Sequence, residues 1–328
     1  MASNYPLVSI CIPAFNAGRW ISHTIESAIN QTWQNKEIII VDDGSTDNTW
    51  NIIQSFVDKY PNIIKSFVQQ NRGACAARNF ALEKSNGQYI QWLDADDILH
   101  PQKIENQMKY AIELVNPNVL FCGSYGIFRK NPDKSIIIQD ELSRDLKPIE
   151  WMITFLGKVL MTQPGIWLIH RQLAEKAGPW DESLIRNQDG EYIFRLVSKS
   201  GFVKFTPDSK LYYRKAASNS ISSNYSAEAI NSLFNSINKC IKIISETEKS
   251  PRTDRAIRYV LNIFISKYFY TQSESVEKAI NLLKYYGGDF KGPQESALFS
   301  IIKIFIGTKN ALKLKSLWGT FKYRTQLK

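Results

Sequence analysis

Residues 7–43 read LVSICIPAFNAGRWISHTIESAINQTWQNKEIIIVDD, and this stretch decides the fold. Apolar runs at 7–13 and 37–43 enclose a segment, 18–31, in which apolar residues recur at helical spacing. Continuous apolar runs are typical of parallel strands that are covered on both faces, and helical crossovers join such strands. The stretch therefore predicts a strand–helix–strand unit of an α/β protein.

The alternation of strand and helix patterns continues to about residue 215. We expect further strands at 62–69, 89–93, 118–128, 165–171, 202–205 and 211–215. Helices are expected after residue 49 and at 76–85, 171–178 and 189–201. In the turn at 44–49, Ser45 or Thr46 is expected to cap the helix that follows.

Polar side chains gather at the carboxyl ends of three of these strands. They are found in 13–16, at Asp42 and Asp43, and in 94–97. In open α/β sheets, ligands bind in the crevice outside the carboxyl ends of the strands. We therefore expect these three segments to line one binding site.

The third of these segments lies in GQYIQWLDADDILHP, residues 87–101, where Asp94, Asp96 and Asp97 follow an apolar run. Three adjacent carboxylates repel one another unless a cation or hydrogen-bond donors compensate them. A nucleotide diphosphate with a divalent cation would do so, since such a cation often bridges carboxylates and phosphate oxygens. The alternative is a turn or helix-start cluster, which the triplet alone does not exclude.

Four stretches in this order carry a family resemblance: VSICIPAFNAGRWISHTIESAINQTW (8–33), EIIIVDDGSTDNT (37–49), NRGACAARNFAL (71–82) and GQYIQWLDADDIL (87–99). They closely resemble the nucleotide-sugar glycosyltransferases of family 2, over roughly residues 6–215. The resemblance implies a GT-A fold, with a Rossmann-like mixed sheet flanked by helices. It also implies inverting transfer of a sugar, most often from UDP, with Mn²⁺ or Mg²⁺.

Carried onto this chain, the resemblance assigns the nucleotide site to the first two strand ends. Asp43 is implied to accept the uracil N3–H, and Pro13, Phe15 and Asn16 to form part of the base pocket. A helix N-cap is the alternative role for Asp43.

The donor sugar and metal are assigned to the third strand end. Asp94 is implied to contact the ribose or donor sugar and Asp96 to bind the metal, with Asp97 structural. Arg78 resembles a donor-site residue, because its permanent charge suits a pyrophosphate or a carboxylate. A salt bridge to one of the acids is the alternative role for Arg78.

The acceptor side is assigned to GPWDESLIRNQDGEYIFRL, residues 178–196. Asp189 takes the position of the catalytic base that inverting displacement needs, with Glu191 as the less favoured choice. The Glu that usually precedes the base is Gln188 here. Trp180 and Asp181 resemble an aromatic-Asp turn near the acceptor, where Trp180 either stacks on a sugar or packs in the core. Arg214 is a further candidate for contact with the diphosphate.

The C-terminal part of the chain is basic and mainly helical, and we expect two domains, 1–224 and 225–328. Of a net charge of +10, residues 225–328 carry +9, from 17 Lys and Arg against 8 Asp and Glu. Residues 296–328 form a basic amphipathic segment that suits peripheral contact with anionic lipid. A helical lid or dimer surface is the alternative, and the oligomeric state stays open. No recognised nucleic-acid motif is present, so we expect no such partner.

Length and composition limit the class of protein. With 328 residues and 44% hydrophobic residues the chain can bury a large core. No segment reaches the roughly 18 apolar residues of a spanning helix, and the four cysteines have no metal-type spacing. We expect reduced, buried thiols and a cytoplasmic protein, at the cytosolic face of the membrane if 296–328 binds lipid.

Together these features predict a metal-dependent, non-processive sugar transferase. Its partners would be a nucleoside-diphosphate sugar, with UDP preferred, and a glycan or lipid-linked acceptor. The alternative is a non-catalytic nucleotide-sugar-binding or assembly protein of the same fold, which Gln188 keeps open.

Overall fold

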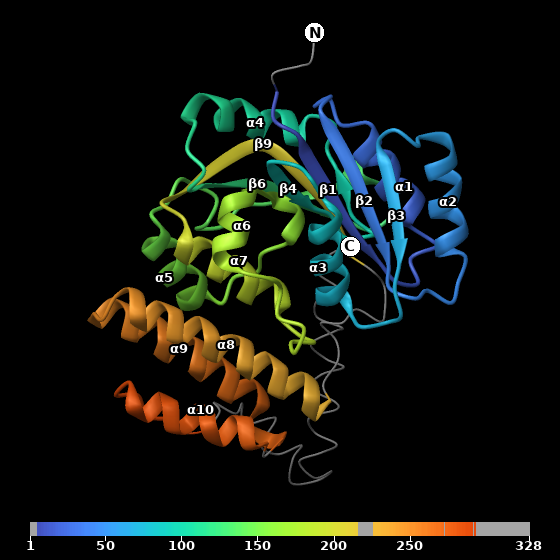
Figure 1. Cartoon of the computed structure of the whole chain (residues 1–328). Helices are drawn as coiled ribbons and strands as arrows, with labels where there is room; N and C mark the ends of the chain where they lie inside the picture. Colours follow the sequence, from blue (N-terminus) through green and yellow to red (C-terminus); the bar gives the residue numbers. More distant parts are fainter. Residues whose placement is uncertain (1–4, 216–225, 272, 291, 293–328) are drawn as a thin grey trace. The chain divides into compact units, whose positions relative to one another are not determined.

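A computed structural model describes residues 5–215, 226–271, 273–290 and 292 (Figure 1). Contacts between Cα atoms divide the chain into two compact units, Met1–Val260 and Leu261–Lys328. The predicted domain boundary at 224/225 lies outside the described residues and stays a prediction, as does the predicted role of 296–328.

The first unit is built around one mixed sheet. Its strands follow the order β3-β2-β1-β4-β8-β6-β9-β5, with β7 paired to β6. The parallel half consists of β1 (Val8–Ala14), β2 (Lys36–Asp42), β3 (Ile64–Val68) and β4 (Tyr89–Trp92). The other half consists of β5 (Ile98–Leu99), β6 (Val119–Phe128), β7 (Ile136–Ile138), β8 (Trp167–His170) and β9 (Phe202–Arg214). The expected mixed α/β sheet is confirmed.

Helices connect the strands and cover both faces of the sheet (Figure 1). In chain order they are α1 (Ile21–Ile29), α2 (Thr49–Lys59), α3 (Ala74–Lys84), α4 (Lys103–Leu114), α5 (Pro148–Lys158), α6 (Arg171–Ala177) and α7 (Gln188–Lys199). The helix α8 (Ala227–Thr247) packs against α7 within the first unit. The helices α9 (Pro251–Tyr268) and α10 (Glu274–Tyr285) follow.

Two local expectations are wrong. The strands expected at 202–205 and 211–215 are one strand, β9, because its pairing with β6 continues past a register shift between Gly123 and Ser124. A bulge at that point places Pro207, which has no N–H, where the ladder is interrupted. The N-cap of α2 is Asn48 and neither Ser45 nor Thr46, since both of those residues bond to Asn16 instead.

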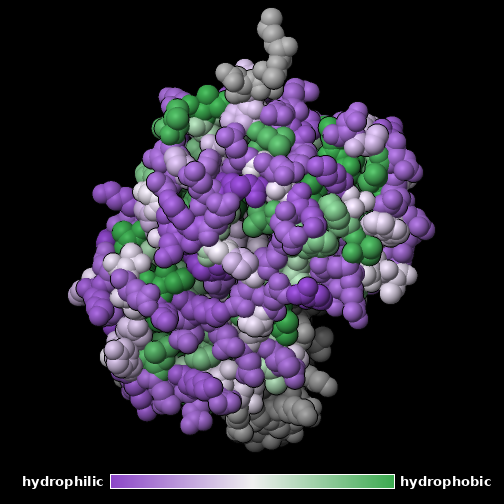
Figure 2. Space-filling model, in the orientation of Figure 1, coloured by the Kyte–Doolittle hydropathy of each residue, from purple (hydrophilic) through white to green (hydrophobic). Residues whose placement is uncertain are grey.

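The cysteines, the helices and the surface can each be compared with what the composition predicts. All four cysteines are buried and free, as expected. Within the described part of the chain, no helix is both long enough and apolar enough to cross a membrane. On the face shown in Figure 2, hydrophobic residues form small groups among hydrophilic ones.

Candidate active site

The ends of β1 and β2 form the first part of the site, and the chain after β1 is pinned to the turn after β2. Asn16 adopts a left-handed conformation, with φ 47°. Its Oδ1 accepts a hydrogen bond from Thr46 N (2.8 Å), and its own N–H donates to Ser45 Oγ (2.9 Å). Pro13 is buried in β1, whereas Phe15 is 48% exposed and open to a ligand. Their predicted role in a base pocket stays a prediction.

Asp43 is buried and holds the segment that leads into α3. Its Oδ1 accepts hydrogen bonds from Gln69 Nε2 (2.7 Å) and Arg72 N (2.9 Å). Its Oδ2 accepts from the backbone N–H of Gly73 (2.8 Å), the N-cap residue immediately before α3. Gly73 has φ +91°, a conformation that favours glycine. Asp43 is therefore not a cap of α2, and its Oδ2 keeps a lone pair with which it could accept a base N–H.

The D-x-D-D loop, residues 94–97, is held by groups from two distant elements. Thr24 of α1 donates to Ala95 O and Asp97 O, at 2.9 Å each. The buried Asp97 accepts from Arg214 N (2.8 Å). Asp97 is therefore a structural residue of the loop, as the resemblance implied.

Arg214 at the end of β9 fixes the other side of this loop. Its Nε donates to Asp96 O (2.8 Å). Its guanidinium lies between the rings of Trp20 and Phe128, at 4.2 and 4.4 Å from their centroids. Sequence reasoning missed the roles of Thr24 and Trp20, because nothing in their local pattern indicates a contact with residues far along the chain.

Arg78 of α3 joins the two halves of the site. Its side chain is 5% exposed, and its Nη2 lies 2.7 Å from Asp94 Oδ1 and 3.6 Å from Asp189 Oδ1. Its Nε and Nη1 have no hydrogen-bond partner among the described residues. The structure thus shows the ion pair that was the alternative role of Arg78, while two of its nitrogens keep unused donors.

Trp180 lies beneath this guanidinium. The carbon Cζ of Arg78 is 4.4 Å from the centroid of the ring. Tyr192 stacks on Trp180 with ring centroids 3.9 Å apart. Because Trp180 is only 1% exposed, it has no open face on which a sugar could stack. The acceptor-stacking role is therefore excluded in this structure, and Trp180 packs in the core.

The two candidate bases have different surroundings. The side chain of Asp189 is 36% exposed and faces Arg78. Glu191 is buried, and its two oxygens accept from Arg195 Nε (2.8 Å) and Nη2 (2.9 Å). Both oxygens of Glu191 are thus occupied by Arg195, whereas Asp189 Oδ1 has no hydrogen-bond partner among the described residues. The geometry favours Asp189 as the candidate base.

Burial and like charge perturb the acids of this cluster. Burial, with the Asp94 charge next in effect, raises the pKa of Asp96 to about 6. Burial also raises the pKa of Asp189 to about 6, although Arg78 opposes the rise. Burial and the charges of Asp96 and Asp94 raise the pKa of Asp97 well above its ordinary value. A concentration of carboxylates with raised pKa values in one place is typical of a functional site.

Whether these acids could hold a divalent metal depends on the ligand atoms that they offer. The described residues contain no group of three or more His, Cys, Asp or Glu side chains that could hold a metal ion. Asp96 and Asp94 lie close enough for the charge of Asp94 to raise the pKa of Asp96, a repulsion that a cation would relieve. Mg²⁺ commonly uses one or two carboxylates and takes its other ligands from phosphate and water. The residues present fit such a shared site.

Asp181 lies at the start of the loop 181–187, which precedes α7. Its Oδ1 accepts from Ser183 N (2.9 Å) and Oγ (2.6 Å), and its Oδ2 pairs with Lys239 of α8. The opposite side of this loop is tied to the segment around α3, since Arg72 pairs with Glu182 at 2.8 Å. Asp181 thus has protein partners, and its acceptor-side role stays a prediction.

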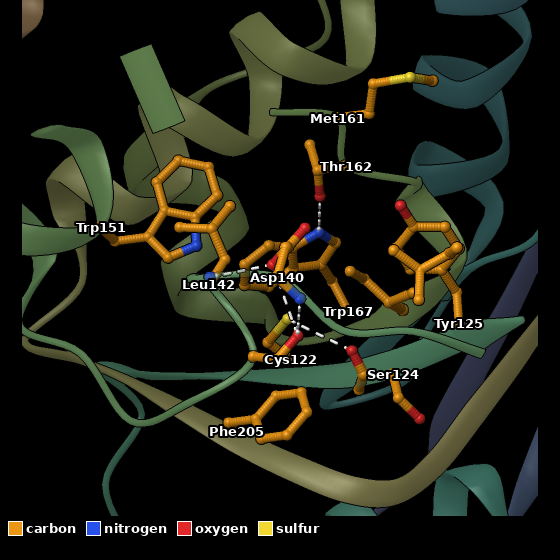
Figure 3. A pocket seen from close by; sticks show the side chains of 14 residues that line it. Cys122, Ser124, Tyr125, Asp140, Leu142, Trp151, Met161, Thr162, Trp167 and Phe205 are labelled. Carbon is orange, nitrogen blue, oxygen red and sulfur yellow. Dashed lines mark hydrogen bonds between the residues drawn. The ribbon is translucent and has the colours of Figure 1, made fainter. Parts of the chain in front are cut away.

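A separate pocket lies beside β6 and the segment around Asp140 (Figure 3). Its lining includes Trp151 and Trp167. The Nε1 of Trp167 donates a hydrogen bond to Thr162 Oγ1 at 2.8 Å. Asp140 at this pocket accepts from Leu142 N (2.9 Å). None of the site residues expected from the sequence lines it, so this hollow is distinct from the carboxylate site.

The mixed sheet with acids at the ends of β2 and β4 defines a nucleotide-sugar-transferase type of architecture. Residues 9–178, just over half of the chain, match the model of the family described as glycosyl transferase family 2. The chain belongs to this family.

Curated relatives match parts of the chain. An uncharacterized glycosyltransferase of Rickettsia typhi is 33% identical over 203 residues, which cover 60% of each chain. Another, of Haemophilus influenzae, is 39% identical over 127 residues, 38% of this chain and 51% of its own. The glycosyltransferase TuaG of Bacillus subtilis, named for teichuronic acid biosynthesis, is 40% identical over 108 residues, 33% of this chain and 43% of TuaG. The chain thus spans between about two fifths and three fifths of the length of these relatives.

Solved structures share the fold at low sequence identity. Staphylococcus aureus TarS 1–349 in complex with UDP-GlcNAc has a TM-score of 0.68 and 16% identity, covering 86% of this chain and 81% of that one. The mannosyltransferase PcManGT of Pyrobaculum calidifontis, in complex with GDP-Man and Mn²⁺, has a TM-score of 0.58 and 15% identity, covering 97% and 88%. The expected GT-A fold is confirmed.

Proposed function

We propose that this protein transfers a hexosyl or N-acetylhexosaminyl group from a nucleoside-diphosphate donor, a UDP-sugar, to a hydroxyl group of a glycan or lipid-linked acceptor. The reaction inverts the anomeric carbon, requires Mn²⁺ or Mg²⁺, adds one sugar at a time and serves cell-surface polysaccharide synthesis. The names of two relatives support this assignment, since TuaG is named for teichuronic acid biosynthesis and the TarS structure contains UDP-GlcNAc.

One observation carries the proposal. Arg78 lies 2.7 Å from Asp94 and 3.6 Å from Asp189, and so brings the D-x-D end of β4 next to the first turn of α7. Inverting displacement needs donor contacts on one side of the anomeric carbon and a base on the other. A protein that only bound the nucleotide would need no partly exposed acid at the second position.

The residues have separate roles in this mechanism. Asp189 accepts the proton of the attacking acceptor hydroxyl, and the nearby guanidinium of Arg78 compensates the charge of its carboxylate. Because burial raises the pKa of Asp189 to about 6, this carboxylate is a stronger base than an ordinary aspartate and is still mostly ionised at pH 7. Asp43 and the exposed Phe15 bind the base of the nucleotide.

Asp96, with Asp94 beside it, would hold the divalent metal. When bound, the ion neutralises the charge that develops on the leaving diphosphate. The unused Nε and Nη1 of Arg78 offer further donors for an anionic group.

The test is transfer from a panel of UDP- and GDP-sugars to lipid-linked and glycan acceptors. Nucleoside diphosphate release and product NMR are measured with Mn²⁺, Mg²⁺ or EDTA. We expect the parent to give an inverted product and Asp189→Asn to lose transfer while still binding UDP. Asp145→Asn is the matched control, because Asp145 pairs with Lys204 outside the cluster.

Each contrary result has a distinct meaning. Donor binding by the parent without transfer to any acceptor would favour the non-catalytic alternative. Undiminished transfer by Asp189→Asn would remove Asp189 as the base. A product of retained configuration would refute the inverting mechanism.

A further inference from the structure

One face of α8 carries polar side chains that all contact the loop 181–187. Ser232, Ser236 and Lys239 are spaced four and three residues apart, which places them on the same side of the helix. Ser232 and Ser236 are buried. Buried hydroxyl groups are costly unless they form hydrogen bonds, so their partners indicate what this face of α8 does.

Ser232 bonds to the backbone of the loop. Its Oγ accepts from Ile185 N (2.9 Å) and Arg186 N (3.0 Å), and it lies 3.5 Å from Arg186 O as a donor. Loop N–H groups usually bond to water or to their own segment. Here a side chain of a helix much later in the sequence fixes two consecutive peptide groups.

Ser236 forms hydrogen bonds with Asn187, the residue immediately before α7. Asn187 is in the left-handed conformation, with φ 57°, and is the N-cap of this helix. Its Nδ2 donates to Ser236 Oγ (2.6 Å), while Ser236 Oγ donates to Asn187 O (3.1 Å). A Cβ on Gly190 would lie 2.6 Å from Asn187 Oδ1. The Asn187 amide therefore lies between Ser236 and the first turn of α7, where Gly190 leaves room for it.

Lys239 closes the other end of the loop through its ion pair with Asp181. Burial favours the neutral form of Asp181, but hydrogen bonds from Lys239 and Ser183 outweigh it and lower the pKa of Asp181 to about 2. The carboxylate of Asp181 is thus ionised at neutral pH.

The candidate base depends on this loop for its position. Asp189 lies two residues after Asn187, and its Oδ1 has no hydrogen-bond partner in the part of the chain that the structure describes. Its nearest fixed charge, Arg78 Nη2, is 3.6 Å away. Because no hydrogen bond to Oδ1 fixes this carboxylate among the described residues, its place depends on the backbone of 187–190 as well as on the charge of Arg78.

We propose that Ser236, assisted by Ser232 and Lys239, is a positioning residue of the transferase, and that α8 holds the carboxylate of Asp189 in its reactive place through Asn187. This inference rests on the proposed function and deepens it. It makes a helix of the basic C-terminal part of the sequence a component of the catalytic site. A misplacement of about 1 Å at a reacting group can cost roughly a hundredfold in rate.

The test compares full-length Ser236→Ala with Ser209→Ala. Ser209 is also a fully buried serine, but its hydroxyl has no hydrogen-bond partner among the described residues. For Ser236→Ala we expect kcat to fall about tenfold to a hundredfold. The KM for the donor and the calorimetric affinity for UDP should stay within about twofold, since neither serine touches the nucleotide side. Ser209→Ala should change neither parameter.

Asn187→Gly is the second variant. It deletes the amide that meets Ser236 and keeps the left-handed backbone, which glycine adopts freely. We expect the same loss of kcat, and a double variant with Ser236→Ala that loses no more than either single one, because both remove the same contact. Hydrogen exchange of peptides covering 185–190 should quicken in both variants, while the unfolding midpoints stay close to that of Ser209→Ala.

The outcomes separate this inference from the function on which it rests. If the parent transfers sugar and Ser236→Ala matches Ser209→Ala in kcat, the positioning role is refuted and the proposed function stands. If kcat and UDP affinity fall together, Ser236 supports the fold as a whole and does not position the base. If the parent transfers no sugar, the proposed function fails and this inference fails with it.

Discussion

Replacing Arg78 by methionine tests the central electrostatic feature of the site. The guanidinium is 5% exposed, pairs with Asp94 at 2.7 Å and lies 3.6 Å from Asp189. Methionine keeps much of the volume above Trp180 but removes the charge. Two carboxylates then lose the cation that compensates them, and burial already disfavours the charged form of one of them, Asp189.

The size of the expected stability loss in Arg78→Met follows from the burial of this guanidinium. Two unit charges about 4 Å apart interact by about 4 kcal/mol at an effective dielectric constant near 20. Removal of one partner from a buried pair costs about 3–5 kcal/mol of unfolding free energy. For a unit of this size each 1 kcal/mol shifts the unfolding midpoint by roughly 2–4 °C. We therefore expect Arg78→Met to lower the midpoint by roughly 6–20 °C.

The loss of unfolding free energy in Arg78→Met should also depend on pH. Burial and the charge of Asp94 raise the folded-state pKa of Asp189, and Arg78 opposes this rise, so removal of Arg78 should raise that pKa further. An acid with a raised folded pKa destabilises the fold as pH rises through that pKa. The deficit of Arg78→Met relative to the parent should thus be larger at pH 8 than at pH 5.

Urea unfolding at several pH values is the assay, with Arg72→Met as the matched control. Arg72 pairs with Glu182 at a similar distance, 2.8 Å, but their side chains are 63% and 40% exposed. An exposed pair contributes about 0–1 kcal/mol. The double variant Arg78→Met/Asp94→Asn should recover part of the loss. A cost for Arg78→Met no larger than that for Arg72→Met, or one independent of pH, would refute the reasoning.

Three further predictions concern the acids and one buried cation. Asp189→Asn should lower kcat by about 10²–10⁴ and leave UDP affinity unchanged in calorimetry, whereas Glu191→Gln should chiefly lower the unfolding midpoint. Metal-dependent UDP binding should weaken as pH falls through about 6, where Asp96 gains a proton. The variant Asp96→Asn should bind UDP weakly at every pH. A UDP affinity of the parent that does not change with pH would contradict this prediction. Lys103 is fully buried, and burial lowers its pKa well below 10.5. In the parent, unfolding free energy should therefore rise with pH toward 10.5, and Lys103→Met should flatten that rise, as urea titrations from pH 7 to 10 would show.

Much of the fold was predictable because its signals are local. Apolar runs at 7–13 and 37–43 became β1 and β2, and the polar strand ends do lie at one edge of the sheet, since β1, β2 and β4 are parallel neighbours. The signal was weaker where an element is short or irregular. The two residues of β5 carry no periodicity, and the bulge in β9 looks like a break between two strands.

The sequence named residues that the structure brings together, but it did not predict their contacts. The acids Asp94 and Asp189 were both expected from the resemblance, and Arg78 had two alternative roles of which the structure shows the ion pair. Trp180 was expected to face a sugar or the core, and its burial decides for the core. An aromatic residue in a turn has the same local pattern in both cases.

By itself the sequence determined the order of strands and helices, the family and the residues that carry charge at the strand ends. These features depend on the spacing of residue types along the chain, which can be read directly from the sequence. Only the tertiary structure decided that Arg78 joins Asp94 to Asp189 and that Ser236 of α8 fixes Asn187. Such contacts depend on which strands are neighbours and which helix faces pack together, and no local pattern encodes the distance between residues so far apart in the chain.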